Sequence, residues 1–419
     1  MLEKLKNAWR IEELRKKIIY TLGMLLLYRL LSVIPVPGMD LTKVSDAIKN
    51  FSILNFMSMM TGGSFERMTI MAMGITPYIN SSIILQLLTV AIPSLEKLAK
   101  EGPEGRRKIN EYTRYLTIIL AFIQAVGLVV AMNAMAKSGF QWYLVIGICM
   151  AAGTALAMWI GERITENGIG NGISLLIMAG IVSNLFNWFA GMITGVAGGT
   201  VNIFGVLIVL AILLAMIVCV TYVDMGERRI PVQYARRVVG RKMYGGQSTH
   251  IPMKLLAVGV LPLIFAYSFM AFPGTIMAMV PALAKSGAYA WWQANMNQQS
   301  WLYALICALL IIGFSYFYSA ISFNPEDISK NVQQQGGHIP GVRPGTATTM
   351  YLQRTSKRLT LFAALFLALL ATLPTFLWRT VNVTVPFGAS SILIAVQVAL
   401  ETLRQLEAQM TMRHYKGFL

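Results

Sequence analysis

The stretch A-M-G-I-T-P-Y-I, Ala72 to Ile79, recurs 185 residues later as A-V-G-V-L-P-L-I, Ala257 to Ile264. Proline removes a backbone donor and kinks a helix, and a nearby glycine loosens the same turn. In lipid, such an interruption is tolerated only where the freed backbone is buried in protein or lines a cavity. Matching broken helices in two halves of a membrane protein therefore predict a central pathway between those halves.

The composition on both sides of this repeat is that of an integral membrane protein. Hydrophobic residues make up 56% of the 419 residues and charged residues 13%, whereas a soluble domain has about 25% charged residues. A helix needs roughly 20 apolar residues to cross the hydrocarbon core. We expect an all-α membrane protein with ten transmembrane helices, near residues 18–36, 68–93, 115–135, 142–161, 170–190, 203–224, 255–281, 301–323, 359–378 and 386–403.

The basic residues predict how these helices are oriented. If the N-terminus is cytoplasmic, 28 of the 35 Lys and Arg residues fall in cytoplasmic segments. The positive-inside rule therefore places both termini in the cytoplasm. Most of the net charge of +17 reflects this bias, so nucleic acid is not the default partner. Contact with anionic lipids or with an RNA-rich machine at the cytoplasmic face stays open.

Ten helices divide into two halves of five, residues 1–190 and 203–419. Because five is odd, the two halves have inverted topologies, and we expect them to be pseudo-symmetric around a central channel. Residues 191–202 join the halves, and their glycines give conformational freedom. A hinge is one interpretation of this junction, and an ordinary tight turn is the other.

Three connecting segments have unusual compositions. Residues 51–66 are apolar and rich in Met but too short to cross a membrane, which predicts a short helix folded back into the protein. In the predicted cytoplasmic loop 225–254, Val, Tyr and Gln alternate with pairs of basic residues, which predicts an extended hairpin with a basic tip. The loop 324–358 is rich in Gly, Pro and polar residues. Both loops are long for a transporter, and we expect them to be docking surfaces.

The residues do not suggest an enzyme. The histidines His250, His338 and His414 lack the spacing of metal ligands. The run G-I-G-N-G, Gly168 to Gly172, follows a predicted helix and has no lysine after it, so it is a poor match to a phosphate loop. Central parts of the predicted helices lack Asp and Glu, which argues against a pump driven by protons or sodium. We expect neither a cofactor nor a metal.

Motifs along nearly the whole chain resemble one family. They are I-P-V-P-G from Ile34, G-I-T-P-Y-I from Gly74, E-G-P-E-G-R-R-K from Glu101, G-E-R-I-T-E-N-G-I-G-N-G-I-S from Gly161, A-R-R from Ala235, Q-S-T-H-I-P from Gln247, F-N-P from Phe323, I-P-G-V-R-P-G from Ile339 and R-H-Y from Arg413. In this order they resemble the SecY family, the pore subunits of the bacterial Sec protein translocon. The stretch Met253 to Pro262 departs from the family, which more usually has Asn and Ala there.

The resemblance implies a clamshell of two halves around an hourglass channel that narrows at a ring of aliphatic side chains. On this sequence the ring falls on Ile75, Ile79, Ile173, Ile177, Ile264 and Ile394. An apolar constriction excludes water and ions by dewetting, and β-branched side chains suit it because they are stiff. Ordinary helix packing is the alternative for each isoleucine. The plug, which seals the external funnel in this family, corresponds to residues 51–66, with Phe51, Ile53, Leu54, Phe56, Met57, Met60, Gly62 and Gly63.

The resemblance also implies a lateral gate through which an apolar signal helix leaves sideways into the lipid. The corresponding residues are Gly74, Pro77, Asn80, Ser81, Ser82, Gln86, Gln124, Gly259, Pro262 and Ser268. The polar members are candidates for interhelical hydrogen bonds, worth about 0.6 to 2 kcal/mol each, that latch the closed gate. Generic bonding between helices explains them equally well.

The two long cytoplasmic loops correspond to the docking site of the ribosome and of the motor ATPase SecA. The contact residues would be Arg236, Arg237, Arg241, Lys242, Arg343, Pro344 and Gly345, and charge that only sets the topology is the alternative for the basic ones. Further implied partners are SecE-like and SecG-like small membrane subunits, signal peptides, nascent polypeptides and anionic lipids, all at the cytoplasmic (inner) membrane. We expect a protein-conducting channel, and a secondary transporter with inverted repeats for a small solute is the alternative.

Overall fold

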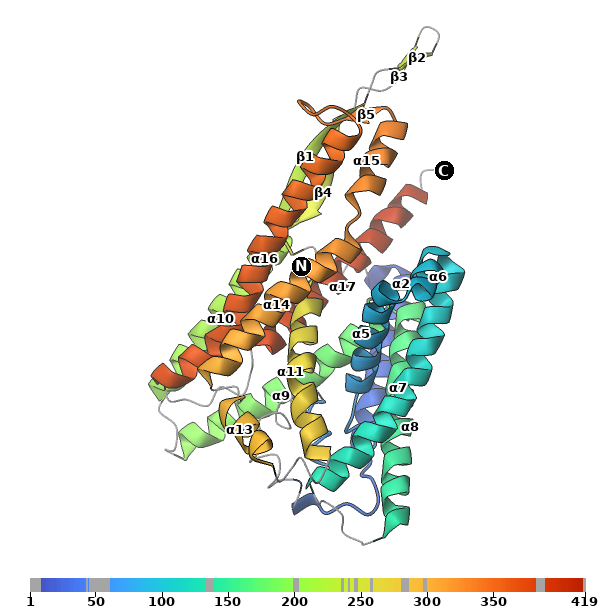
Figure 1. Ribbon diagram of the computed structural model, residues 1–419. Helices are drawn as coiled ribbons and strands as arrows, with labels where there is room; N and C mark the ends of the chain where they lie inside the picture. The colour runs from blue at the N-terminus through green and yellow to red at the C-terminus, as the bar shows by residue number, and fades with distance from the viewer. Residues whose placement is uncertain are drawn as a thin grey trace. The chain divides into compact units, whose positions relative to one another are not determined.

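The computed structural model describes residues 9–42, 44, 61–132, 139–198, 203–234, 237–239, 242–244, 248–256, 259–279, 286–296, 300–381 and 389–416. Helices dominate these residues (Figure 1). They group into two compact units, and each is described by itself. Unit 1 comprises Met1–Val206, Ser268–Ser300 and Val398–Leu419, and unit 2 comprises Leu207–Tyr267 and Trp301–Gln397.

These units differ from the predicted halves 1–190 and 203–419. The stretches that follow Tyr267 and Gln397 group with unit 1, although both belong to the predicted second half. The division into two inverted five-helix halves therefore stays a prediction.

The helices of unit 1 are α2 (Glu12–Leu31), α5 (Thr76–Ala91), α6 (Pro93–Lys100), α7 (Pro103–Met132), α8 (Phe140–Asn167), α9 (Gly172–Ala197) and α13 (Gly287–Asn295). Those mainly of unit 2 are α10 (Ile203–Met225), α14 (Trp301–Ser322), α15 (Pro325–Gln334) and α16 (Thr346–Val381). Two more helices, α11 (Leu261–Met279) and α17 (Ala389–Lys416), contribute residues to both units.

Several of these helices are long and apolar enough to cross a membrane. Within the described residues, 6 stretches meet this condition, namely Pro103–Val130, Phe140–Asn167, Gly172–Gly191, Phe204–Met225, Trp301–Gln334 and Thr346–Leu373. The bent pair of α5 and α6 adds a seventh if the pair is one span. The chain is therefore a multi-pass membrane protein, and the full number of ten helices stays a prediction.

Both copies of the repeated stretch begin a helix, and this corrects the expectation that their prolines kink one. Helix α5 begins at Thr76 and α11 begins at Leu261, so Pro77 and Pro262 each occupy the second helical position. Proline is well tolerated there, because the amides of the first turn have no partner within the helix. The interruption exists in both places, but it lies before each proline.

The glycine three residues before each proline supplies the turn. Gly74 has φ +52° and Gly259 has φ +66°, values that glycine adopts at no steric cost. The amide of Gly74 donates to the Met71 carbonyl at 2.9 Å, and that of Gly259 donates to the Leu256 carbonyl at 3.1 Å. The same hydrogen bond thus closes the same turn at both ends of the 185-residue repeat.

Helix α5 is shorter than the predicted span 68–93, and its two ends show why. Residues 61–75 form turns before it, and after Ala91 the chain bends by 102° into α6. No residue of α6 is buried. There, Lys100 donates a 2.6 Å hydrogen bond to Glu96, and this bond and the ammonium charge lower the pKa of the Glu96 carboxyl.

Helix α9 is longer than expected at the predicted hinge. It continues to Ala197 and therefore includes the first part of residues 191–202. Residues 199–202 lie outside the described residues, so a hinge between two halves stays a prediction.

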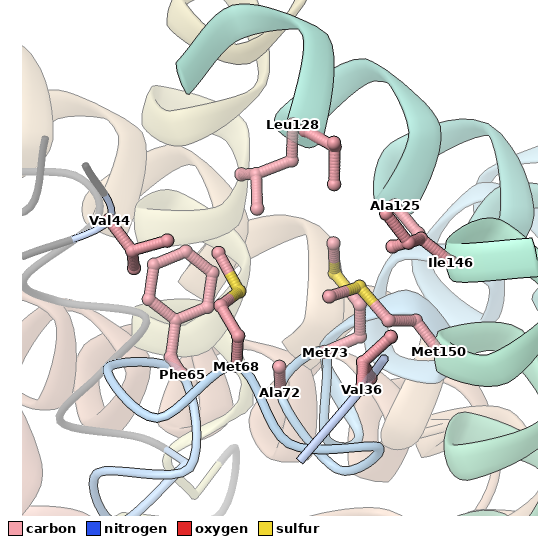
Figure 2. Packing of buried hydrophobic residues seen from close by; sticks show 11 residues of the cluster. Val36, Val44, Phe65, Met68, Ala72, Met73, Ala125, Leu128, Ile146 and Met150 are labelled. Atoms are coloured by element: carbon pink, nitrogen blue, oxygen red, sulfur yellow. The ribbon is translucent and has the colours of Figure 1, made fainter. Parts of the chain in front are cut away.

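The core of unit 1 closes over the segment 61–75 (Figure 2). Phe65, Met68 and Met73 of this segment are fully buried. They pack with side chains of α7, α8 and the I-P-V-P-G motif, namely Ala125, Leu128, Val129, Ile146, Met150 and Val36. Two backbone hydrogen bonds join the motif to the segment, from the Val36 amide to Met68 at 2.9 Å and from the Ile70 amide to Ile34 at 3.0 Å.

Unit 2 carries a small sheet with strand order β4-β1-β5, in which β5 is Gly337–His338. Strands β1 (Glu227–Tyr234) and β4 (Ser248–Lys254) pair in antiparallel fashion, as do the short strands β2 (Arg237–Val239) and β3 (Lys242–Tyr244) between them. Figure 1 shows β2 and β3 beyond the end of the β1–β4 ribbon. The predicted extended hairpin in the loop 225–254 is confirmed.

The second long loop contains more helix than its composition predicts. Helix α15 occupies Pro325–Gln334, and α16 already begins at Thr346. The Asn324 side chain caps α15 by accepting from the Glu326 amide at 3.1 Å. The true connection is therefore the short stretch between Gln334 and Thr346.

Candidate functional site

Two of the predicted ring residues lie at the start of α5. Ile75 directly precedes this helix, and the Ile79 amide donates to the Ile75 carbonyl at 3.1 Å. Their exposed fractions are 6% and 9%. Because residues four apart lie on one face of a helix, these two side chains form one apolar strip.

Two further ring residues lie at the start of α9. Asn171 caps this helix, because its side-chain oxygen accepts from the amides of Ile173 and Ser174 at 3.1 and 3.2 Å. A Cβ atom at Gly161 of α8 would lie 3.0 Å from Ile173 Cγ1, so the close approach of α8 and α9 positions this side chain. The G-I-G-N-G run is thus a helix-start turn, and it presents Ile173 and Ile177 one turn apart.

The ring residues of unit 2 lie on α11 and α17. The Ile264 amide donates to the Val260 carbonyl at 3.1 Å, the counterpart of the bond between Ile79 and Ile75. The neighbouring Phe265 packs edge-on against Phe314 and Tyr318 of α14, with ring centroids 5.9 and 5.5 Å away.

The sixth ring residue, Ile394, is buried on α17 with an exposed fraction of 5%. Ile394 and Ile264 belong to unit 2, and the other four ring residues belong to unit 1. A ring formed by all six stays a prediction.

The structure covers only the end of the predicted plug. Its residues Phe51, Ile53, Leu54, Phe56, Met57 and Met60 lie outside the described residues. Gly62 and Gly63 are described, with φ +66° and +81°. Both glycines belong to the buried segment 61–75, so the described end of the predicted plug is part of the core of unit 1.

The gate residues of α5 have hydrogen-bond partners within their own helix. The Ser81 hydroxyl donates to the Pro77 carbonyl at 2.8 Å, and the Gln86 amide donates to the Ser82 hydroxyl at 3.3 Å. Such local bonds satisfy polar groups without another helix. The remaining polar candidates, Asn80, Gln124 and Ser268, are half-buried on α5, α7 and α11. A polar latch between helices stays a prediction.

The loop between α15 and α16 presents Arg343 and Pro344 to solvent. It is held at both ends, since the Thr348 hydroxyl donates to the Arg343 carbonyl at 2.9 Å and the Ser329 hydroxyl donates to the Gly345 carbonyl at 3.0 Å. Gly345 has φ +99°, which favours glycine. Arg343 is therefore an exposed charge on a fixed support.

The basic tip of the other loop is described only in part. Arg236 and Arg241 lie outside the described residues, whereas Arg237 and Lys242 belong to β2 and β3.

No local feature of the sequence indicates that the two long loops meet. Strand β5 (Gly337–His338) pairs with the end of β1, opposite Gln233 and Tyr234. One buried hydrophobic cluster includes residues of both loops, namely Ile230, Val232, Val332, Ile339 and Leu352. A two-residue strand has no periodicity to detect, so only the fold makes the two loops one surface.

No metal site emerges from this part of the molecule. Among the residues that the structure describes, no group of three or more His, Cys, Asp and Glu side chains gathers within reach of one ion.

Comparisons of the sequence with known proteins show which family the chain resembles. A sequence model of the SecY family matches residues 69–403. The "Protein translocase subunit SecY" of Halalkalibacterium halodurans is 42% identical over the whole length of both chains. That of Thermotoga maritima is 40% identical over 100% of this chain and 98% of its own.

Solved structures show the same fold. One described as "The structure of a protein conducting channel" matches with TM-score 0.69 and 20% identity, over 94% of this chain and 92% of its own. Another, of Sec61 in the canine ribosome-channel complex from the endoplasmic reticulum, matches with TM-score 0.63 and 19% identity, over the same shares of the two chains.

Proposed function

The chain belongs to the SecY family, and we propose that it is the protein-conducting channel subunit of a protein translocase. Unfolded secretory chains would pass through the isoleucine constriction, and transmembrane segments would leave through a lateral gate. The relatives named above are translocase subunits along their whole length, so the small-solute transporter has no support. The channel subunit itself is not an enzyme, and the energy for transport would come from its partners.

One observation carries this proposal beyond family membership. The turns before α5 and α11 share their glycine conformation and their hydrogen bonds, and each places an isoleucine, Ile79 or Ile264, at the same helical position. A pair of equivalent turns in two halves of opposite topology is what a pathway between the halves requires. Apolar β-branched side chains there would close around a chain of any sequence without binding it.

The ten-helix arrangement is part of the same proposal. It would comprise two inverted halves joined near residues 191–202, the plug at residues 51–66, and both termini in the cytoplasm. The fold shared with channel structures and the apolar stretches of the described helices support it.

The joined cytoplasmic loops would be the docking surface for the ribosome and for the motor SecA. Exposed Arg343 on its fixed support and the basic β2–β3 tip suit acidic motor surfaces and RNA phosphates. SecE-like and SecG-like subunits and anionic lipids would complete the assembly in the cytoplasmic membrane. Charge reversal, Arg343→Glu, should abolish motor-driven export from membrane vesicles while the protein stays folded. Normal export by that variant would remove Arg343 from this role.

Site-specific photocrosslinking tests the channel itself. A photoreactive residue replaces Ile79 or Ile264 in the complete complex, and a secretory precursor is stalled during export. We expect adducts from both positions that disappear when the signal sequence is deleted. Positions Leu26 of α2 and Leu214 of α10 serve as controls, because both are more than 60% exposed on apolar helices. An engaged precursor that gives adducts at the controls and none at the isoleucines would overturn the proposal.

A further inference from the structure

Arg29 is a permanent charge in the apolar second half of α2, within the predicted transmembrane segment 18–36, and nothing in the proposed pathway uses it. It lies in the last turn of this helix and is half-buried. Charged side chains in membrane-spanning segments are rare and costly, and those that occur usually have specific partners. Cations are favoured at helix C-termini, but this position alone does not explain where the side chain points.

The guanidinium of Arg29 joins two segments far apart in the sequence. Its Nη2 donates to the Gly62 carbonyl at 3.3 Å and also donates to the Ser183 hydroxyl of α9. A guanidinium can serve two acceptors at once, because its five donors have a fixed planar arrangement. Arg29 therefore connects α2, the end of the predicted plug and α9.

The backbone at Gly62 fits tightly between these helices. A Cβ atom there would lie 2.7 Å from Arg29 Nη1 and 3.1 Å from Gly180 Cα of α9. Only glycine suits this position, since its φ is also left-handed. The Gly62–Gly63 turn thus occupies a slot with the α9 backbone on one side and the Arg29 charge on the other.

The residues on the far side of this turn are rigidly held. Ser64 has an exposed fraction of 2%, and Phe65 and Met68 are fully buried. The contact with Arg29 therefore adjoins the buried core of unit 1, at the described end of the predicted plug.

We propose that Arg29 is a positioning residue of the resting channel, which holds the Gly62–Gly63 turn of the predicted plug against α9. This inference rests on the proposed function. Without the guanidinium, the Gly62 carbonyl and the Ser183 hydroxyl lose a charge-assisted partner, and the turn is free to leave its slot. The closed state is then less populated and the resting channel conducts ions.

The test uses Arg29→Met in the complete complex, with Leu30→Met as the matched control because Leu30 is 60% exposed on the same helix. Methionine keeps an unbranched apolar stem and removes the guanidinium and its charge. We expect the resting ion conductance in planar bilayers to rise about tenfold, since a hydrogen bond from a charged group shifts an equilibrium by at least this factor. Ser183→Ala should raise the conductance less, and Arg29→Lys should restore part of the seal.

A second measurement reports the turn directly. In a background without the three native cysteines, Ser64→Cys should be labelled slowly by a water-soluble maleimide. Adding Arg29→Met should speed the labelling several-fold, and adding Leu30→Met should not. A general loss of folding would instead lower the melting temperature and the yield of the complex.

The outcomes separate the inference from the function on which it rests. Wild-type conductance and labelling in a folded Arg29→Met channel that still crosslinks precursor would overturn the role of Arg29 alone. Absence of precursor crosslinks in the wild type would overturn the channel itself. If Arg29→Met fails to fold, Ser183→Ala and Arg29→Lys decide, and unchanged conductance in both would overturn the inference.

Discussion

The turns before α5 and α11 are built in the same way but lie in different surroundings. Each has a left-handed glycine, the same backbone hydrogen bond from it, and a proline at the second helical position. Around Gly74, a Cβ atom would meet Thr61 Cγ2 at 3.1 Å and the Tyr28 hydroxyl at 3.9 Å. Among the described residues, a Cβ atom at Gly259 would meet the Gln397 amide, with Nε2 at 3.0 Å.

The shared backbone geometry of the two turns depends on residues within the repeat, whereas the packing around each turn depends on residues far away in the chain. The first turn is the last part of the buried segment 61–75, whereas the second follows strand β4, which ends at Lys254. The glycine and proline of the repeat produce the same turn twice, but the side chains packed around each turn determine how much space a substituted residue would have. The first copy should therefore tolerate change less well than the second.

We expect the largest loss of stability from Gly153→Ala, because this substitution disrupts the packing of α8 against the segment 61–75. A Cβ atom at Gly153 of α8 would overlap the Ile70 carbonyl oxygen, and backbone cannot move aside as a side chain can. We expect a loss of roughly 3 kcal/mol, at the upper end for overpacking, and a poor yield of folded protein. Thermal unfolding in detergent measures it. Gly23→Ala is the control, since nothing lies within 4 Å of its Cβ position; equal melting temperatures would show that the segment 61–75 is not packed on α8.

An intermediate effect is expected when each turn glycine becomes alanine. Both variants put a side chain at a left-handed φ, which costs about 1 to 2 kcal/mol, and Gly74→Ala also presses on buried Thr61. Gly259→Ala meets the end of a flexible side chain, so its melting temperature should fall less. Adding Gln397→Ala should recover part of the Gly259→Ala loss but none of the Gly74→Ala loss. A larger loss at Gly259 would reverse the comparison.

The smallest effect is expected from Pro77→Ala and Pro262→Ala. At the second helical position a proline contributes mainly by restricting the unfolded chain, worth about 0.4 to 1 kcal/mol. Both variants should therefore fold, with melting temperatures a few degrees lower at most and similar to each other. If either substitution stabilised the protein by relieving a bend, the prolines would be kinks within helices after all.

Much of the fold follows from local sequence. The apolar stretches predict membrane helices, and the alternation of residues in the loop 225–254 predicts a hairpin that the structure confirms. The helix limits were less well predicted. The buried turns at residues 68–75 are as apolar as a membrane helix, because burial in protein and burial in lipid select the same side chains.

The resemblance proposes the six isoleucines and Arg343 as site residues, and the structure shows the local surroundings of several of them. The site itself stays a prediction. The pairing of β5 with β1 and the contact of Arg29 with Gly62 had no local signal. Each depends on partners far away in the chain, and one sequence carries no record of which distant residues meet.

The membrane location, the recurrence of two glycine–proline turns and the family could therefore all be predicted from the sequence alone. These properties depend on composition and on interactions between residues a few positions apart. The folded structure alone shows that each proline begins a helix, that the two long loops share one sheet, and that Arg29 reaches partners 33 and 154 positions away. A local backbone preference acts wherever its residues occur, whereas a long-range contact exists only once the whole chain has packed.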